Sequence, residues 1–251
     1  MTTKSNNSFL TPEWPLPDNV QALTTTRLGG VSHHPFGAFN LGAHVSDVAE
    51  LVVQNRSKLA EQCRLPENAL QWLNQTHGIL VCEAEPDAII READASYSSS
   101  QGVACVIMTA DCLPVLLCDK QGRQVAAVHA GWRSLAGGII EATLATFPNP
   151  LDVTAWLGPA ISPTAFEVGK DVIDAFCTNF PESAENAFSP HPNNPDKWLA
   201  DLYLLARIRL QSQGVTAIYG GDFCTFNDES RFYSYRRDGQ TGRMASLIWL
   251  T

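Results

Sequence analysis

Four short apolar segments between residues 78 and 130 constrain the fold of this chain more than any other feature. They read "GILVCE", "GVACVIMT", "PVLLCD" and "QVAAVHA", and turn-forming residues separate them. Short segments that are continuously apolar and rich in valine and isoleucine are typical of strands that are buried on both faces. The sequence therefore predicts a central sheet that other elements cover on both sides.

The last two of these segments are joined by "DKQGR" at residues 119–123, which predicts a hairpin turn. Cys112 lies at the start of one strand and His129 near the end of its partner, so both lie at the same end of the hairpin. Because antiparallel neighbours are about 5 Å apart, the two side chains can meet. Taken alone, the pair is compatible with metal ligands, with a nucleophile and its base, or with two buried structural residues.

Helices and further strands flank this central region. Asp47 is predicted to cap the first helix, and Glu50 completes a capping box with it. The predicted helices are "SDVAELVVQNRSKLAEQCR", "WRSLAGGIIEATLATF", "KDVIDAFCTNF" and "KWLADLYLLARIRLQSQG". The further strands are "VQALTTT", "LDVTAWL", "VTAIYGG" and "MASLIWL". Residues 1–19, with "TPEWPLP", predict an extended arm, and residues 20–251 predict a single α+β domain because no repeat or linker divides them.

Composition excludes several classes of partner. The formal net charge of -9 would repel a phosphate backbone, so we expect no nucleic-acid binding. No stretch approaches the roughly 18 apolar residues that cross a bilayer, and the N-terminus lacks a signal-peptide pattern, so we expect a soluble cytoplasmic protein. The 7 cysteines lack the spacing of a disulfide framework and predict free thiols.

A third residue extends the pair at the end of the hairpin. His77, in "LNQTHGIL", lies in a polar break that precedes a predicted strand. With Cys112 and His129 it makes a His₂Cys set, and catalytic zinc sites typically have three protein ligands and one open position. A metal-free hydrolase with Cys112 as nucleophile and His129 as base remains an alternative, although it leaves His77 without a role.

Seven blocks of sequence carry a resemblance to a known family. In order from about residue 22 they are "TTTRLGGVS", "FNLGAHVSD", "QTHG", "TADCLPVLL", "AVHAGWRSLAGGI", "LGPAISPTAFEVGKDV" and "SYRRDGQTGRMASLIWL". The chain resembles the YfiH-like family, also called the laccase-domain or multicopper polyphenol oxidase family. The resemblance implies a layered α/β/β/α domain with mixed sheets, related to the catalytic domain of cytotoxic necrotizing factor. It also implies Zn²⁺ bound by His77, Cys112 and His129, and Cu²⁺ as a metal that the site could take up in vitro.

The resemblance implies a purine nucleoside phosphorylase that cleaves adenosine, inosine or S-methyl-5′-thioadenosine with phosphate and that also deaminates adenosine. An editing hydrolase of cell-wall (peptidoglycan) precursors, and a noncatalytic metal-stabilised binding domain, remain alternatives. Copper laccase activity is disfavoured, because the chain has 6 histidines and no HxH pair. Met108, the imaginable axial copper ligand, would lie about 13 Å from Cys112 along an extended strand.

Further residues are assigned to substrate and catalysis. Arg27, in the glycine-rich turn "RLGGVS", is predicted to bind phosphate in a bidentate manner. Asn40 would orient a ribose hydroxyl, and Arg133 would bind substrate near the metal end of the hairpin. Cys112, His129 and Glu167 are the predicted catalytic residues, with Glu167 as a general acid or base. The structural alternatives are a surface position for Arg27, a turn cap for Asn40, a solvated Arg133 and a helix-cap contact for Glu167. The oligomeric state is not predicted.

Overall fold

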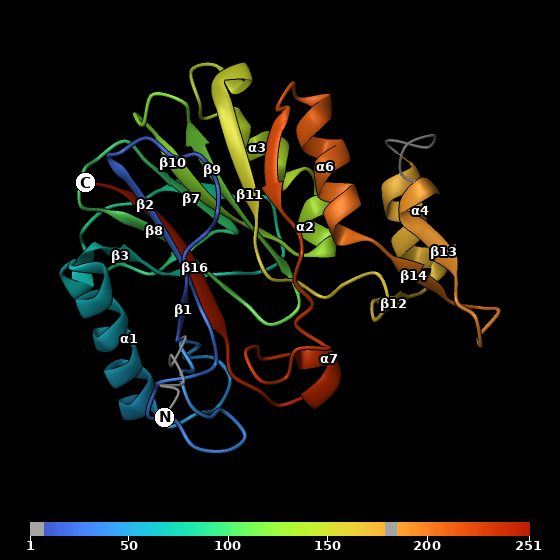
Figure 1. The fold of residues 1–251 in the computed structure, drawn as a ribbon, viewed down its shortest axis with the longest axis horizontal. Coiled ribbons are helices and arrows are strands. Elements are labelled where there is room, and N and C mark those ends of the chain that lie inside the picture. The colour runs from blue at the N-terminus through green and yellow to red at the C-terminus, as the bar shows by residue number, and fades with distance from the viewer. Residues whose placement is uncertain (1–7, 179–184) are drawn as a thin grey trace, which may run out of the picture.

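The computed structural model describes residues 8–178 and 185–251. Two sheets pack face to face, and helices cover both outer faces (Figure 1). Helix α1 (Ala49–Cys63) covers the five-stranded sheet, and helices α2 (Trp132–Gly137), α3 (Ile139–Leu144) and α6 (Leu202–Ser212) cover the six-stranded sheet. The predicted single α+β domain with α/β/β/α layers is confirmed.

The five-stranded sheet has the order β1-β2-β16-β8-β3. Its strands are Phe9–Leu10, Val20–Thr25, Met244–Leu250, Ala104–Thr109 and Leu70–Gln71 in that order. Side chains of β8 alternate: Cys105 and Ile107 enter the core between the sheets, whereas Val106 and Met108 pack toward α1. The C-terminal strand β16 therefore lies in the middle of this sheet, and the residue that precedes it comes close to the ends of β2 and β8.

The six-stranded sheet has the order β15-β11-β9-β10-β7-β5. Its strands are Ala217–Gly220, Val153–Leu157, Leu113–Asp119, Val125–Ala130, Ala95–Ser98 and Val81–Glu83 in that order. Strands β9 and β10 form the predicted antiparallel hairpin, and His129 is the register partner of Pro114. Cys112 and His129 consequently lie at the same end of the hairpin, as predicted.

A smaller unit projects beside the main layers (Figure 1). It contains helix α4 (Lys170–Cys177) and the strands β12 (Glu167–Val168), β13 (Phe188–Pro190) and β14 (Trp198–Ala200). The remaining elements are β4 (Leu73–Asn74), which pairs with β6 (Arg91–Glu92), the short helix α7 (Tyr235–Asp238), and the 3₁₀ turns Glu67–Ala69, Pro150–Asp152 and Glu185–Ala187. No helix in the described part of the chain is long and apolar enough to cross a membrane.

The predicted helix over "WRSLAGGIIEATLATF" is wrong as a single element. It divides into α2 and α3 at Gly138, whose φ of 104° lies in the left-handed region. Glycine adopts this conformation without the steric cost that a Cβ atom brings. The break changes the direction of the chain directly after the segment that contains His129.

Two helix starts also differ from the predictions. The N-cap of α1 is Val48, without a side-chain cap bond, because the Asp47 carboxylate instead accepts from Ser32 and Asn40. The segment Trp198–Ala200 is strand β14, and α6 begins after Asp201, whose carboxylate caps Leu204 N at 2.9 Å. Pairing of β14 with β12 and β13 therefore overrides the helical pattern there.

The predicted N-terminal arm is described only in part. Within residues 1–19, Phe9–Leu10 forms β1 and pairs with β2, while residues 1–7 lie outside the described residues. The last residues of the predicted helix "KDVIDAFCTNF", at 179–180, lie outside them as well. The division of the chain at residue 19 stays a prediction.

Candidate metal centre and active site

The structure brings His77, Cys112 and His129 together. Their donor atoms all lie within 4.8 Å of one another, and Cys112 Sγ is 3.9 Å from His77 Nε2. His129 is buried, Cys112 is half-buried and His77 is exposed, so the cluster opens to solvent on one side. In the described part of the chain this is the one group of His, Cys, Asp or Glu side chains arranged to hold a metal ion.

Asp94 orients two members of the cluster. Its buried carboxylate lies 2.8 Å from His129 Nδ1, which leaves Nε2 of that ring for a metal. The same carboxylate accepts from the backbone N–H groups of Thr76, His77 and Gly78 at 3.2, 3.0 and 2.6 Å. These bonds stabilise the left-handed φ of 60° at His77, which is uncommon for a residue other than glycine. Burial alone would raise the pKa of Asp94, but its hydrogen bond and charge interaction with His129 lower it.

Asp111, the residue before Cys112, is fixed by two hydrogen bonds of its carboxylate. Its φ is 91°, and the chain reverses here between β8 and β9. The carboxylate accepts from Thr225 Oγ1 at 2.7 Å and from Arg236 N at 2.7 Å. Sequence analysis missed both Asp94 and Asp111. The sequence signal for each was an acidic residue next to an apolar strand. Such a residue can be assigned a role only when the neighbouring strands in the sheet are known.

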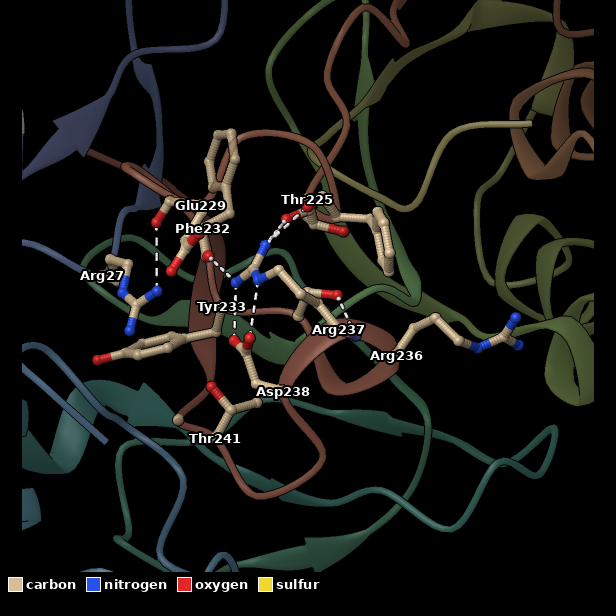
Figure 2. A network of polar contacts seen from close by, with 12 residues as sticks. Arg27, Thr225, Glu229, Phe232, Tyr233, Arg236, Arg237, Asp238 and Thr241 are labelled. Carbon is tan, nitrogen blue, oxygen red and sulfur yellow. Dashed lines mark hydrogen bonds and ion pairs between the residues drawn. The ribbon is translucent and has the colours of Figure 1, made fainter. Parts of the chain in front are cut away.

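Arg237 stabilises the segment that contains Thr225, whose hydroxyl donates to Asp111 (Figure 2). This guanidinium donates to the carbonyl oxygens of Thr225, Phe226 and Phe232 and pairs with Asp238. In Figure 2 Arg236 extends away from Arg237, and its Nη1 donates to the carbonyl of Glu167 at 2.8 Å. The two adjacent arginines thus stabilise different segments around the site.

Cys112 differs chemically from the buried cysteines. Burial raises the pKa of Cys63, Cys105 and Cys118 to about 12, as expected for small core residues. Burial opposes ionisation of Cys112 as well, but the charge of His129 and the hydrogen bonds of both histidines lower its pKa to about 6. The thiolate, which is the form that binds metals, is therefore accessible at neutral pH.

The donor set fits a metal ion. One thiolate and two imidazoles are ligands that zinc and copper share, whereas magnesium and calcium prefer oxygen. Gly131 leaves the necessary space, since a Cβ atom there would lie 3.1 Å from Cys112 Sγ, 3.1 Å from His77 Cδ2 and 3.4 Å from His129 Cε1.

Gly131→Ala is expected to lower metal affinity roughly 10-fold, the lower end of what disturbed ligand orientation costs. The backbone at Gly131 has φ -59° and ψ 154°, which alanine adopts readily, so stability should change little. Chelator competition measures the affinity, with Gly169→Ala as a matched control at an extended position outside the cluster. If Gly131→Ala bound metal as tightly as the unmodified protein, a Cβ atom at this position would not disturb the three side chains, and this prediction would be wrong.

A cavity of about 450 Å³ lies against the cluster. Besides the three candidate ligands, its lining includes His44, Gln75, Met108 and Arg243, and Tyr235, which is 61% exposed, stands at its rim. Gln75 holds one wall, because its amide accepts from Met108 N at 2.7 Å and donates to Met108 O at 2.8 Å. The volume falls within the range of small-ligand sites in proteins.

The distance argument against Met108 as a copper ligand does not apply. Strand β8 ends at Thr109 and the chain turns at Asp111, so residues 108–112 are not one extended strand, and Met108 lines the same cavity as Cys112. The Met108 sulfur instead contacts Arg56 Nη2 at 3.9 Å. The case against laccase chemistry rests on the 6 histidines of the sequence, none of which forms an HxH pair.

Arg27 does not line this cavity. Its guanidinium donates to the carbonyl oxygens of Gly37 and Glu229 and lies 5.0 Å from the centre of the Tyr233 ring (Figure 2). Three acidic residues, Asp222, Asp228 and Glu229, line the surface depression around it, together with one further basic residue, Arg231, which pairs with Asp228. These carboxylates disfavour a phosphate ion at Arg27.

The other predicted substrate and acid–base residues also lie outside the cavity lining. Asn40 is fully buried and accepts from Gly42 N and Arg243 N, which agrees with its alternative role as a turn cap. Arg133 is exposed and lies over the Trp132 ring at 4.2 Å. Glu167 lies on β12, with its carboxylate 3.5 Å from His191 Nε2.

Comparisons with known proteins show to which family the chain belongs. The family model described as "Multi-copper polyphenol oxidoreductase laccase" matches residues 21–251. A Pseudomonas aeruginosa protein named purine nucleoside phosphorylase is 56% identical over 97% of this chain and 99% of its own length. The Escherichia coli purine nucleoside phosphorylase YfiH is 50% identical over 97% of this chain and 99% of its own length.

A solved structure of a Neisseria meningitidis protein shares 52% identity with a TM-score of 0.92, covering 97% of this chain and 99% of that one. Sequence and fold thus agree with these relatives over almost the whole chain. The chain belongs to the YfiH-like family, which carries the laccase-domain description.

Proposed function

We propose that this protein is a zinc-dependent purine nucleoside phosphorylase. Its substrates are adenosine, inosine and S-methyl-5′-thioadenosine, each cleaved with phosphate, and it also deaminates adenosine. The observation that carries the proposal is the His77–Cys112–His129 cluster, which opens on a nucleoside-sized cavity of about 450 Å³. Relatives that match almost the whole chain bear the name of this activity.

In phosphorolysis an oxygen of phosphate forms a bond to C1′ of the ribose while the bond from C1′ to the purine nitrogen breaks. The purine leaves with a proton on nitrogen, and ribose 1-phosphate is the second product. Zinc held by His77, Cys112 and His129 would supply Lewis-acid chemistry next to the bound substrate. Asp94 keeps His129 in the orientation that this requires, and Tyr235 adds an aromatic ring at the rim of the cavity.

Deamination replaces the amine on the purine ring with the oxygen of water and releases ammonia. The same cavity can serve both reactions, because each acts on a bound purine nucleoside. Glu167 is not assigned the acid–base role, since its carboxylate faces His191. We place the activity in the cytoplasm, where all 7 cysteines, which are free thiols in the structure, would remain reduced.

A metal-free hydrolase is the second candidate function. It is favoured by one observation, the pairing of a Cys112 thiol whose pKa is about 6 with His129. It leaves His77 without a catalytic task. Zinc is preferred because it uses all three donors that the structure brings together.

Protein purified without added metal is expected to contain about one zinc per chain, and to release free purine base from all three nucleosides only when phosphate is present. Chromatography detects the base and ribose 1-phosphate, while formation of inosine from adenosine reports deamination. Cell-wall precursor nucleotides are tested with the same sample. Base release that is independent of phosphate, or turnover of the cell-wall precursors alone, would overturn the proposal.

A further inference from the structure

The cavity beside the cluster contains a guanidinium although the chain is acidic. Arg243 and His44 line it, and no aspartate or glutamate does among the described residues. The chain as a whole has 26 acidic and 17 basic residues. Arg56 lies behind the same wall, where its guanidinium stacks 3.9 Å from the centre of the Trp72 ring and bonds to Leu41 O. A cavity lined in this way favours an anionic ligand.

Arg243 is half-buried and has no carboxylate partner in the described part of the chain. Its Nη1 donates to the carbonyl oxygens of Thr241 and Gly242, each at 3.0 Å. No described group accepts from its Nε or Nη2. Other arginines of this protein, such as Arg91 and Arg209, pair with acidic residues. A desolvated guanidinium with unused donors is costly unless an anion binds to it.

The surrounding segments are built to hold this side chain. The backbone N–H of Arg243 donates to the buried Asn40 Oδ1 at 2.9 Å, and the same oxygen accepts from Gly42 N. A Cβ atom at Gly42 would lie 2.8 Å from Arg243 Cγ and 3.4 Å from His44 Cε1. Glycine at position 42 thus leaves the space that both cavity-lining side chains occupy.

Arg243 also lies near the candidate metal ligands. Arg243 and Cys112 line one cavity, together with Tyr235. An anion on Arg243 would therefore share the cavity with whatever is bound at His77, Cys112 and His129.

We infer that Arg243 forms the phosphate-binding subsite of this cavity, with the guanidinium donating to two phosphate oxygens and His44 lining the cavity beside it. The inference rests on the proposed function, because phosphorolysis requires bound phosphate. It replaces Arg27, whose donors are directed to carbonyl groups and whose neighbours are acidic. Asn40 becomes a positioning residue that acts through the backbone of Arg243.

Arg243→Gln tests the inference through steady-state kinetics with inosine and varied inorganic phosphate. The KM for phosphate should rise about 10- to 100-fold, the range expected for loss of a charge-assisted contact, while the KM for inosine changes less than about 2-fold. Arg243→Lys keeps the charge but loses the bidentate geometry, so its KM for phosphate should be intermediate. Unchanged zinc content and circular dichroism exclude a folding defect as the cause.

Arg27→Gln tests the rival site, and Lys120→Gln removes one positive charge at the turn of the β9–β10 hairpin, far from the cluster. Both should leave the KM for phosphate unchanged. An increase in Arg27→Gln without one in Arg243→Gln would overturn the inference, and so would equal increases in the KM for phosphate and for inosine in Arg243→Gln.

Direct titration of inorganic phosphate by calorimetry separates this inference from the proposed function. If the protein cleaves no nucleoside but binds phosphate, and Arg243→Gln abolishes that binding, the subsite stands while the proposed function fails. If cleavage occurs and Arg243→Gln binds phosphate as well as the unmodified protein does, the subsite fails alone. Adenosine 5′-monophosphate in a parallel titration distinguishes a substrate phosphate from inorganic phosphate, and binding of the nucleotide only would overturn the inference.

Discussion

Replacing His77 with asparagine is expected to remove the bound metal and to lower phosphate-dependent base release by roughly 10³-fold or more. Loss of a residue that only orients a ligand already costs 10- to 100-fold in metal affinity, so loss of the ligand itself should exceed about 100-fold. A Lewis-acid metal contributes several kcal/mol to transition-state stabilisation, which corresponds to that loss of rate. Metal analysis and the base-release assay on the same sample give the two results.

The asparagine substitution suits the backbone at this position. His77 has a φ of 60°, and asparagine tolerates the left-handed region better than alanine does. His77 is also exposed, so its replacement removes little packing. His33→Asn is the matched control, because it exchanges an exposed histidine that does not line the cavity.

The same variant separates the two candidate functions. In a metal-free hydrolase Cys112 and His129 form the reacting pair and His77 is dispensable, so His77→Asn should remain active. In the zinc enzyme all three ligands are needed, and Cys112→Ala should lose metal and activity to a similar extent. An active, metal-free His77→Asn protein would contradict the zinc assignment.

The hairpin and its ligands were predictable because they depend on contacts close in sequence. Cys112 and His129 flank two apolar strands joined by a short turn, so period and turn residues alone place them at one end. His77 stood out because a histidine in a polar break before a strand has no evident packing role. The family resemblance then implied that the three form one ligand set.

The residues that support the ligands could not be predicted in the same way. Asp94 reaches His129 only because β7 pairs with β10, with Ala95 the register partner of Val128. Arg243 reaches the cavity because β16, the last strand, lies between β2 and β8. Arg27 had the right chemistry for phosphate. Its position, however, depends on contacts with residues far away in the sequence, such as Glu229, which lies 202 positions later in the chain. Each of these placements follows from strand order, which local patterns do not encode.

Local propensity also failed where tertiary pairing competed with it. The segment that begins at Trp198 has a helical pattern, yet its first residues pair as β14 with β12 and β13. The site was less affected by such errors, because its ligands lie at the ends of strands whose apolar runs are unambiguous. The core between the sheets, with Ile107 and Leu116 fully buried, provides the rigid base from which those ends project.

Asp94→Asn is expected to weaken metal binding by about 10- to 100-fold and to lower the free energy of unfolding by about 2–4 kcal/mol. The carboxylate accepts from His129 Nδ1 and from three backbone N–H groups around His77. An asparagine side chain keeps one acceptor oxygen, and its NH₂ group replaces the other. That NH₂ group would face either the His129 Nδ1–H group or the backbone N–H groups, which are donors as well. The His77 turn and the His129 ring should therefore lose their alignment together.

Asp119→Asn is the matched control for this change. Asp119 is also a buried aspartate, and it accepts from Arg123 N and Arg123 Nε at the opposite end of the same hairpin. Its substitution should lower the free energy of unfolding in urea without changing metal affinity in chelator competition. If Asp94→Asn lost stability but bound metal as tightly as Asp119→Asn, Asp94 would be a structural residue only, and the orientation of His129 would have to come from the packing of β10 between β9 and β7.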